Sequence, residues 1–129
     1  MKIYVAAPWT HKHEAIIAGA ALTAAGHTVT SRWFHHQGDA TDSAGTSSPL
    51  ESIIFQARED IADVLKADCL VVLNLAKSEG KAVETGIALA NNIPVISVGP
   101  RSNIFQTLGV ELPNLEAAIL VLSAFIVKR

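Results

Sequence analysis

Hydrophobic residues alternate along the chain between short continuous runs and longer stretches at helical spacing. Continuous runs are typical of strands in a parallel sheet, because both faces of such strands are covered. The stretches between the runs predict amphipathic helices. The expected strands are residues 3–7, 27–31, 69–73 and 93–98, and the expected helices are residues 10–25, 50–65, 81–91 and 114–127, with a helical turn at 104–108.

Polar residues, glycine and proline mark where these helices begin and end. We expect Thr10 to cap the first helix and Gly26 to follow its last turn. Residues 48–51, with Pro49 at the first helical position, are typical of a capping box. Residues 35–48 have no periodicity, and a loop of this length in a compact domain is often a functional lid.

The order of the elements predicts an α/β fold. We expect a three-layer, parallel Rossmann/flavodoxin-like sheet of four to five strands with helices on both faces. Residues 1–129 are expected to form one domain, because no internal repeat or linker interrupts them. Ligands bind beyond the carboxyl ends of such strands. The site is therefore expected to collect residues 6–9, 32–36, 74–80 and 99–103.

Composition narrows the possible partners and locations. Half of the 129 residues are apolar and 17% are charged, which excludes a disordered chain. The net charge of −2 offers no basic field for a nucleic-acid polymer. No apolar stretch reaches the roughly 18 residues of a membrane span. Met1 leads directly into the first strand and Cys69 is the single cysteine, so we expect a cytoplasmic protein without a signal peptide.

The C-terminal segment predicts self-association. Residues 117–127 are apolar on every face of a helix, whereas a helix that covers a sheet needs only one apolar stripe. We expect a homodimer or higher homo-oligomer, with this helix or its neighbour at the interface. The alternative is that the segment is buried inside the monomer under the long loop.

Two carboxylates are candidates for catalysis. Glu84 is expected in the first turn of its helix, where the positive end favours the ionised form of a nucleophile or of an anchor for a developing cation. The alternative is an ordinary glutamate that interacts with the helix dipole. Asp60 lies among apolar positions of the preceding helix. It either points toward the site or pairs at the boundary with Arg58 or Lys66.

Small residues and tryptophans at the strand ends are candidates for substrate binding. Ser78 and Gly80 belong to a strand-to-helix turn, where backbone N–H groups suit a phosphate or another anion. Ala7 ends the first expected strand, Trp9 comes shortly after it, and Trp33 follows the second. Two indoles at the mouth of a site could stack a planar ring such as a nucleobase, and the alternative for each is packing at the rim.

No metal and no cofactor are expected. The histidine pairs at 11/13 and 35/36 lack cysteine or acidic partners at the spacing of metal ligands. No glycine-rich dinucleotide motif follows the first strand, and the pattern of a P-loop is missing. Cys69, in the middle of a strand, is expected to be an inert core residue.

Three segments together resemble the nucleoside 2-deoxyribosyltransferases. Residues 3–9 are similar to that family's opening strand, with a tyrosine and a small-residue turn that ends in tryptophan. Residues 60–72 resemble its second motif, and residues 80–96 resemble its third and most specific motif. The resemblance covers nearly the whole chain, with the motifs in the same order.

The resemblance implies roles for individual residues. Glu84 matches the nucleophile that attacks the anomeric carbon, and Tyr4 matches the tyrosine that orients that carboxylate. Asp60 matches an acid associated with protonation of the base, and Trp9 matches an aromatic residue of the base pocket. In this family a neighbouring subunit often completes the site.

Ser78 departs from the pattern of the nucleoside-specific enzymes, which carry an aspartate six residues before the glutamate to hold the sugar 5′-hydroxyl. Serine there is similar to the 2′-deoxynucleoside 5′-monophosphate N-hydrolases, where it helps to bind phosphate. The resemblance implies cleavage of the N-glycosidic bond of a (2′-deoxy)nucleoside 5′-monophosphate, with the base released to water. The alternatives are base exchange on free deoxynucleosides and a nucleotide-sensing module without turnover.

Overall fold

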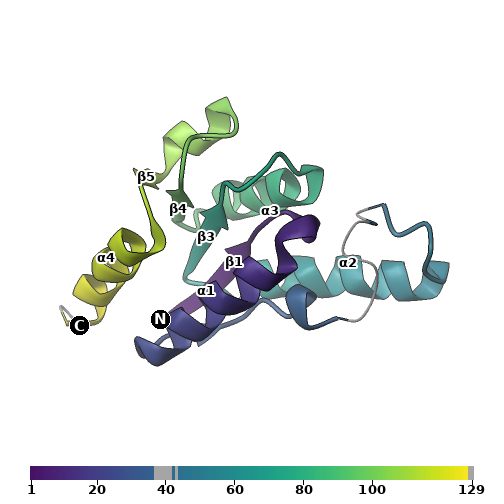
Figure 1. Cartoon of the computed structure of the whole chain (residues 1–129), viewed down its shortest axis with the longest axis horizontal. Helices are drawn as coiled ribbons and strands as arrows, with labels where there is room; N and C mark the ends of the chain where they lie inside the picture. The colour runs from purple at the N-terminus through teal and green to yellow at the C-terminus, as the bar shows by residue number, and fades with distance from the viewer. Residues whose placement is uncertain (37–41, 43, 128–129) are drawn as a thin grey trace.

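The computed structural model describes residues 1–36, 42 and 44–127. Five parallel strands form one sheet in the order β2-β1-β3-β4-β5 (Figure 1). The strands are β1 (Lys2–Ala6), β2 (Thr28–Val29), β3 (Cys69–Leu73), β4 (Val95–Val98) and β5 (Val110–Leu112). The predicted α/β fold is confirmed, and β5 is a strand that the sequence pattern did not indicate.

Among the described residues, the sheet is flanked by four α-helices: α1 (Lys12–Ala24), α2 (Leu50–Leu65), α3 (Glu79–Ala90) and α4 (Leu115–Val127). Short 3₁₀ helices occupy Trp9–His11, Trp33–His35 and Ile104–Leu108. Right-handed crossovers place α1 on one face and α2 with α3 on the other, because the chain leaves β1 in one direction and β2 in the opposite one. In the described part of the chain, no helix is long and apolar enough to cross a membrane.

The reversal of strand order beside β1 positions the site. β1 lies between β2 and β3, and its crossover to β2 runs opposite to the later crossovers. A crevice therefore opens at the carboxyl ends of β1 and β3, where the connecting segments diverge. The two strands pair in register from Ile3 with Cys69 to Ala6 with Val72, and all of these residues are buried. The buried pair of β1 and β3 therefore fixes the positions of the side chains and connecting segments at its carboxyl end.

The end of α1 is as predicted, but its start is not. Gly26 has a φ of 96°, and the N–H of His27 donates to the carbonyl of Leu22, which closes the helix as a Schellman motif. Thr10 does not cap α1. A 3₁₀ turn comes first, α1 begins at Lys12, and no side chain caps it.

The capping box predicted at residues 48–51 is also absent. α2 begins at Leu50 after Pro49, without a side-chain cap. The N–H of Ser48 donates instead to the carbonyl of Gly45, so the serine belongs to the preceding turn. Such local turns compete with helix capping for the same polar groups.

Exposed apolar side chains gather on α2 as well as on α4. On α4, Ala118 and Leu122 are buried, while Leu120 is 73% exposed. α2 exposes more apolar side chains, namely Leu50, Ile54, Phe55, Ile61 and Leu65. Monomers rarely expose that much apolar surface, so homo-oligomerisation stays a prediction and α2 becomes its favoured interface.

We expect Phe55→Glu to yield a monomer and Leu120→Glu to leave the assembly intact, because a charge buried in an apolar interface is costly. Light scattering at micromolar concentration measures both masses. A wild-type species of 13.7 kDa would contradict oligomerisation, and a monomer from Leu120→Glu alone would move the interface to α4.

Candidate active site

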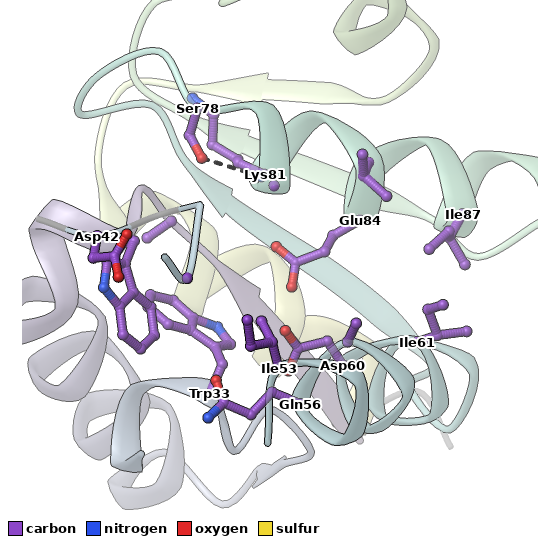
Figure 2. Close-up of a pocket in the computed structure, with 16 residues that line it drawn as sticks. Trp33, Asp42, Ile53, Gln56, Asp60, Ile61, Ser78, Lys81, Glu84 and Ile87 are labelled. Carbon is purple, nitrogen blue, oxygen red and sulfur yellow. Dashed lines mark hydrogen bonds between the residues drawn. The ribbon is translucent and has the colours of Figure 1, made fainter. Parts of the chain in front are cut away.

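A cavity of about 330 Å³ lies at the predicted edge of the sheet, between α2 and α3. Its wall includes every predicted site residue except Tyr4, namely Ala7, Trp9, Trp33, Asp60, Ser78, Gly80 and Glu84. Residues 99–103, which were also expected there, do not line it. Side chains from the two helices take their place (Figure 2).

Tyr4 does not line the cavity, but it binds the carboxylate of Glu84. Tyr4 projects from β1, is fully buried, and donates its hydroxyl hydrogen to Oε2 of Glu84. Burial, followed by the nearby charge of Glu84, raises the pKa of Tyr4 far above its ordinary value. The phenol therefore stays protonated and acts as a fixed donor that orients the carboxylate.

The sequence predicted Glu84 in the first turn of its helix, and this prediction is wrong. α3 begins two residues earlier, because Oγ of Ser78 accepts a hydrogen bond of 3.2 Å from the N–H of Lys81 and caps the helix. Glu84 is therefore in the second turn, where the dipole acts weakly. Burial raises the pKa of Glu84 to about 8; the bond from Tyr4 lowers it and the charge of Asp60 raises it.

Asp60 points from α2 toward Glu84 on α3, across the cavity (Figure 2). Burial raises the pKa of Asp60 to about 6, and its Oδ1 is buried without a hydrogen-bond partner in the described part of the chain. The proposed pairing with Arg58 or Lys66 is not seen among the described residues. The charge of Asp60 raises the pKa of Glu84, and between about pH 6 and 8 the pair holds one proton.

The tryptophans form one side of the cavity. Trp33 is buried, and its Nε1–H donates to the carbonyl of Val5 at 2.8 Å. Its ring centroid is 5.8 Å from that of Trp9, at an angle of 40°. The ammonium group of Lys12 lies 4.5 Å from the centroid of Trp9. The two indoles contact each other, so a planar ligand would stack against this pair rather than between its members.

The turn before α3 presents donors to the cavity. Ser78 and Gly80 line it, and the first N–H groups of a helix have no intrahelical partner. A Cβ added at Gly80 would come no closer than 3.9 Å to Oγ of Ser78, so the backbone there is open. This arrangement suits an anion such as a phosphate group.

Part of the predicted lid lies in the cavity wall, and residues 37–41 and 43 lie outside the described residues. The carboxylate of Asp42 accepts hydrogen bonds from the hydroxyl and the N–H of Ser47 and from the N–H of Thr46, which lowers its pKa to about 2. Gly45 has a φ of 71°, and a Cβ there would lie 2.8 Å from Cγ2 of Ile53. The turn thus packs directly on α2, and its role as a lid stays a prediction.

Sequence reasoning missed Gln56 and Lys81 as site residues. Gln56 lines the cavity near Trp33, one turn before Asp60 on α2 (Figure 2). Gln56 and Asp60 are four residues apart and therefore lie on one helix face. This spacing could have indicated Gln56 as a site residue. Lys81 was not singled out from the sequence, and the structure places its side chain in the interior. Cys69 is buried as expected, and burial raises the pKa of its thiol to about 12.

No protein-family model and no curated protein matches the chain. Solved structures do match it. A 2-deoxyribosyltransferase from Bacillus psychrosaccharolyticus superposes with a TM-score of 0.67 at 20% identity, covering 92% of this chain and 90% of that one. A conserved protein from Enterococcus faecalis V583 gives 0.63 at 18% identity, covering 93% and 95%.

The CMP N-glycosidase BcmB from Clostridium botulinum gives a TM-score of 0.59 at 13% identity, covering 96% of this chain and 99% of that one. These identities are low, and the coverage of both chains is nearly complete in each pair. The fold that the resemblance implied is therefore confirmed, and the chain has the fold shared by a 2-deoxyribosyltransferase and a CMP N-glycosidase.

Proposed function

We propose that the protein cleaves the N-glycosidic bond of a 2′-deoxynucleoside 5′-monophosphate and releases the base to water. One observation carries this proposal: two carboxyl groups of raised pKa, Glu84 and Asp60, face each other across one cavity, and Tyr4 orients the first. Glycoside cleavage needs such a pair, one as nucleophile and one as proton donor.

In the proposed reaction, the pair reacts in the form in which its one proton lies on Asp60 and Glu84 is ionised. A carboxylate oxygen of Glu84 then bonds to the anomeric carbon while the bond from that carbon to the base breaks. The electron pair of the broken bond goes to the base nitrogen, and the base takes a proton from Asp60. A water molecule then attacks the anomeric carbon and gives a proton to Asp60. The glycosyl ester breaks, the sugar phosphate leaves, and Glu84 is a carboxylate again.

Ser78 supports a monophosphate as the substrate. Ser78 and Gly80 line the cavity at the start of α3, and neither residue carries a negative charge that would repel an anion. The Clostridium botulinum neighbour is named for CMP, which is also a nucleoside 5′-monophosphate. The tryptophan pair offers an aromatic surface for the base at the other side of the same cavity.

A panel of deoxynucleosides and their 5′-monophosphates tests the proposal, with base release followed by chromatography. Release from monophosphates without an added base is the expected result. Release only when a free acceptor base is present would establish transfer instead of hydrolysis. Binding without release in every combination would establish a sensor.

Ser78→Asp should shift preference from the monophosphate to the nucleoside. Aspartate also caps helices well, so α3 is preserved, while its carboxylate repels phosphate and can accept a hydrogen bond from a 5′-hydroxyl. We expect the ratio of kcat/KM for monophosphate to kcat/KM for nucleoside to fall by about 100-fold.

Ser78→Asn is the matched control, because asparagine has the shape and capping ability of aspartate without its charge. Its ratio should fall by much less than that of Ser78→Asp. An unchanged ratio in Ser78→Asp would contradict the assignment of this turn to phosphate.

A further inference from the structure

Lys81 carries a buried positive charge beside the turn that holds Ser78. Lys81 is only 1% exposed. Its ammonium group donates to Oδ1 of Asn74 at 3.1 Å, to the carbonyl of Ala76 at 2.9 Å and to Oγ of Ser102 at 2.9 Å. All three of its hydrogens are used, and every acceptor is neutral.

The acceptors are themselves fixed by a network. The hydroxyl of Ser102 donates to Oδ1 of Asn74, which leaves a lone pair of Oγ directed at the ammonium group. Gln106 donates to the same Oδ1 and accepts from the side chain of Asn74 and the N–H of Ser102. The surroundings of Lys81 are therefore built from oriented acceptors, which match the charged form of the side chain.

The charge has no counter-ion in the described part of the chain. No carboxylate of the described residues lies within ion-pair distance of Lys81. Burial lowers the pKa of Lys81, and no negative group offsets this effect. Buried charges in proteins are normally paired, because removing an ion from water is costly. An unpaired cation of this kind fits a site that receives its anion from a ligand.

The position of Lys81 relative to the cavity indicates which ligand group would benefit. Lys81 contributes to the cavity wall together with Ser78 and Gly80. Its backbone N–H donates to Oγ of Ser78, and its ammonium group holds the carbonyl of Ala76, two residues before Ser78. The charge thus lies behind the turn that faces the cavity, with no hydrogen left to contact a ligand directly.

We propose that Lys81 is the specificity-determining and positioning residue for the 5′-phosphate: its buried charge favours an anionic substrate at a distance, and its hydrogen bonds to Asn74 and Ala76 hold the turn that carries Ser78. This inference rests on the proposed function, since it requires a substrate with a 5′-phosphate. The charge acts strongly because it is shielded from water and salt, unlike the charge of an exposed lysine.

The test compares the binding of deoxynucleoside 5′-monophosphates and their parent nucleosides by calorimetry. Glu84→Gln serves as the background in all proteins, so that turnover does not interfere. Adding Lys81→Met should weaken monophosphate binding by about 30-fold and change nucleoside binding by less than about 3-fold. Lys77→Met is the matched control, because Lys77 is an exposed lysine of the same turn and its charge is screened.

Ser102→Ala separates the charge from the hydrogen bonds. It removes one acceptor of Lys81 but keeps the ammonium group, so the ratio of the two dissociation constants should stay within about 3-fold of the background value. Thermal melting confirms that each variant is folded. Lys81→Gln replaces Lys81→Met if methionine prevents folding, since it is also neutral but can still donate to the turn.

Equal loss of monophosphate and nucleoside binding in the Lys81 variants would overturn the specificity role and leave a structural one. An unchanged ratio would overturn it as well. If the background protein itself shows no preference for monophosphates, the proposed monophosphate substrate is wrong. The role of Lys81 in phosphate recognition is then also wrong. A lost preference in the Lys81 variants alone supports the inference.

Discussion

Glu84→Gln is expected to reduce base release by a factor on the order of 10³ or more, because it removes the nucleophile of a covalent mechanism. Glutamine keeps the size of the side chain and can still accept the hydrogen bond from Tyr4. The loss should therefore appear in kcat, without unfolding of the protein. Steady-state base release from the monophosphate measures it.

Glu116→Gln is the control, since Glu116 is an exposed glutamate in the first turn of α4 and does not line the cavity. Its activity should match that of the wild type. Retention of more than about a tenth of the activity in Glu84→Gln corresponds to only about 1.4 kcal/mol of barrier. That result would remove Glu84 from the role of nucleophile.

Glu84→Gln should also be more stable than the wild type at neutral pH. The pKa of Glu84 is raised to about 8 in the folded protein from an ordinary value of 4.5, so the fold favours the protonated form. The wild type then loses stability as the pH rises from about 4.5 through 8, because the unfolded chain gives up this proton first. Glutamine does not titrate, and the difference in melting temperature should vanish near pH 4.

The sheet could be predicted from the sequence because its strands are continuous apolar runs. Residues 69–73 were predicted with correct bounds, and all five are buried. β5 was missed because it is an edge strand of only three residues, Val110–Leu112. A segment this short is too short to show a distinct apolar run or a distinct alternation of apolar and polar residues. β2 is shorter than predicted, since only Thr28 and Val29 pair with β1.

Site residues could be predicted from the sequence where they follow the ends of strands. They could not be predicted where contacts between distant segments determine the burial or the pKa of a side chain. Ala7, Trp9 and Ser78 lie in the cavity as the topology requires. The ionisation of Glu84 was predicted from the helix dipole, but burial raises its pKa instead of lowering it. Lys81 shows the same limit, because nothing in its local sequence indicates that Asn74 and Ser102 surround it.

Asp60→Asn is expected to lower kcat by about 10² to 10⁴, the usual contribution of a general acid. Asparagine fills the same space but cannot donate a proton to the departing base. The wild type should show a bell-shaped pH profile with its maximum between about pH 6 and 8, where the pair of Asp60 and Glu84 holds one proton. Asp60→Asn should lose the alkaline limb, since no proton donor remains to titrate.

The leaving group distinguishes an acid from a merely structural residue. An N7-methylated purine deoxynucleotide carries a base that is already cationic, so its departure needs no proton. Asp60→Asn should therefore cleave this substrate at a rate within about 10-fold of the wild type, while its rate on the unmethylated nucleotide falls by the full factor. A loss of equal size on both substrates would show that Asp60 acts by shaping the cavity or by setting the pKa of Glu84, and not by donating the proton.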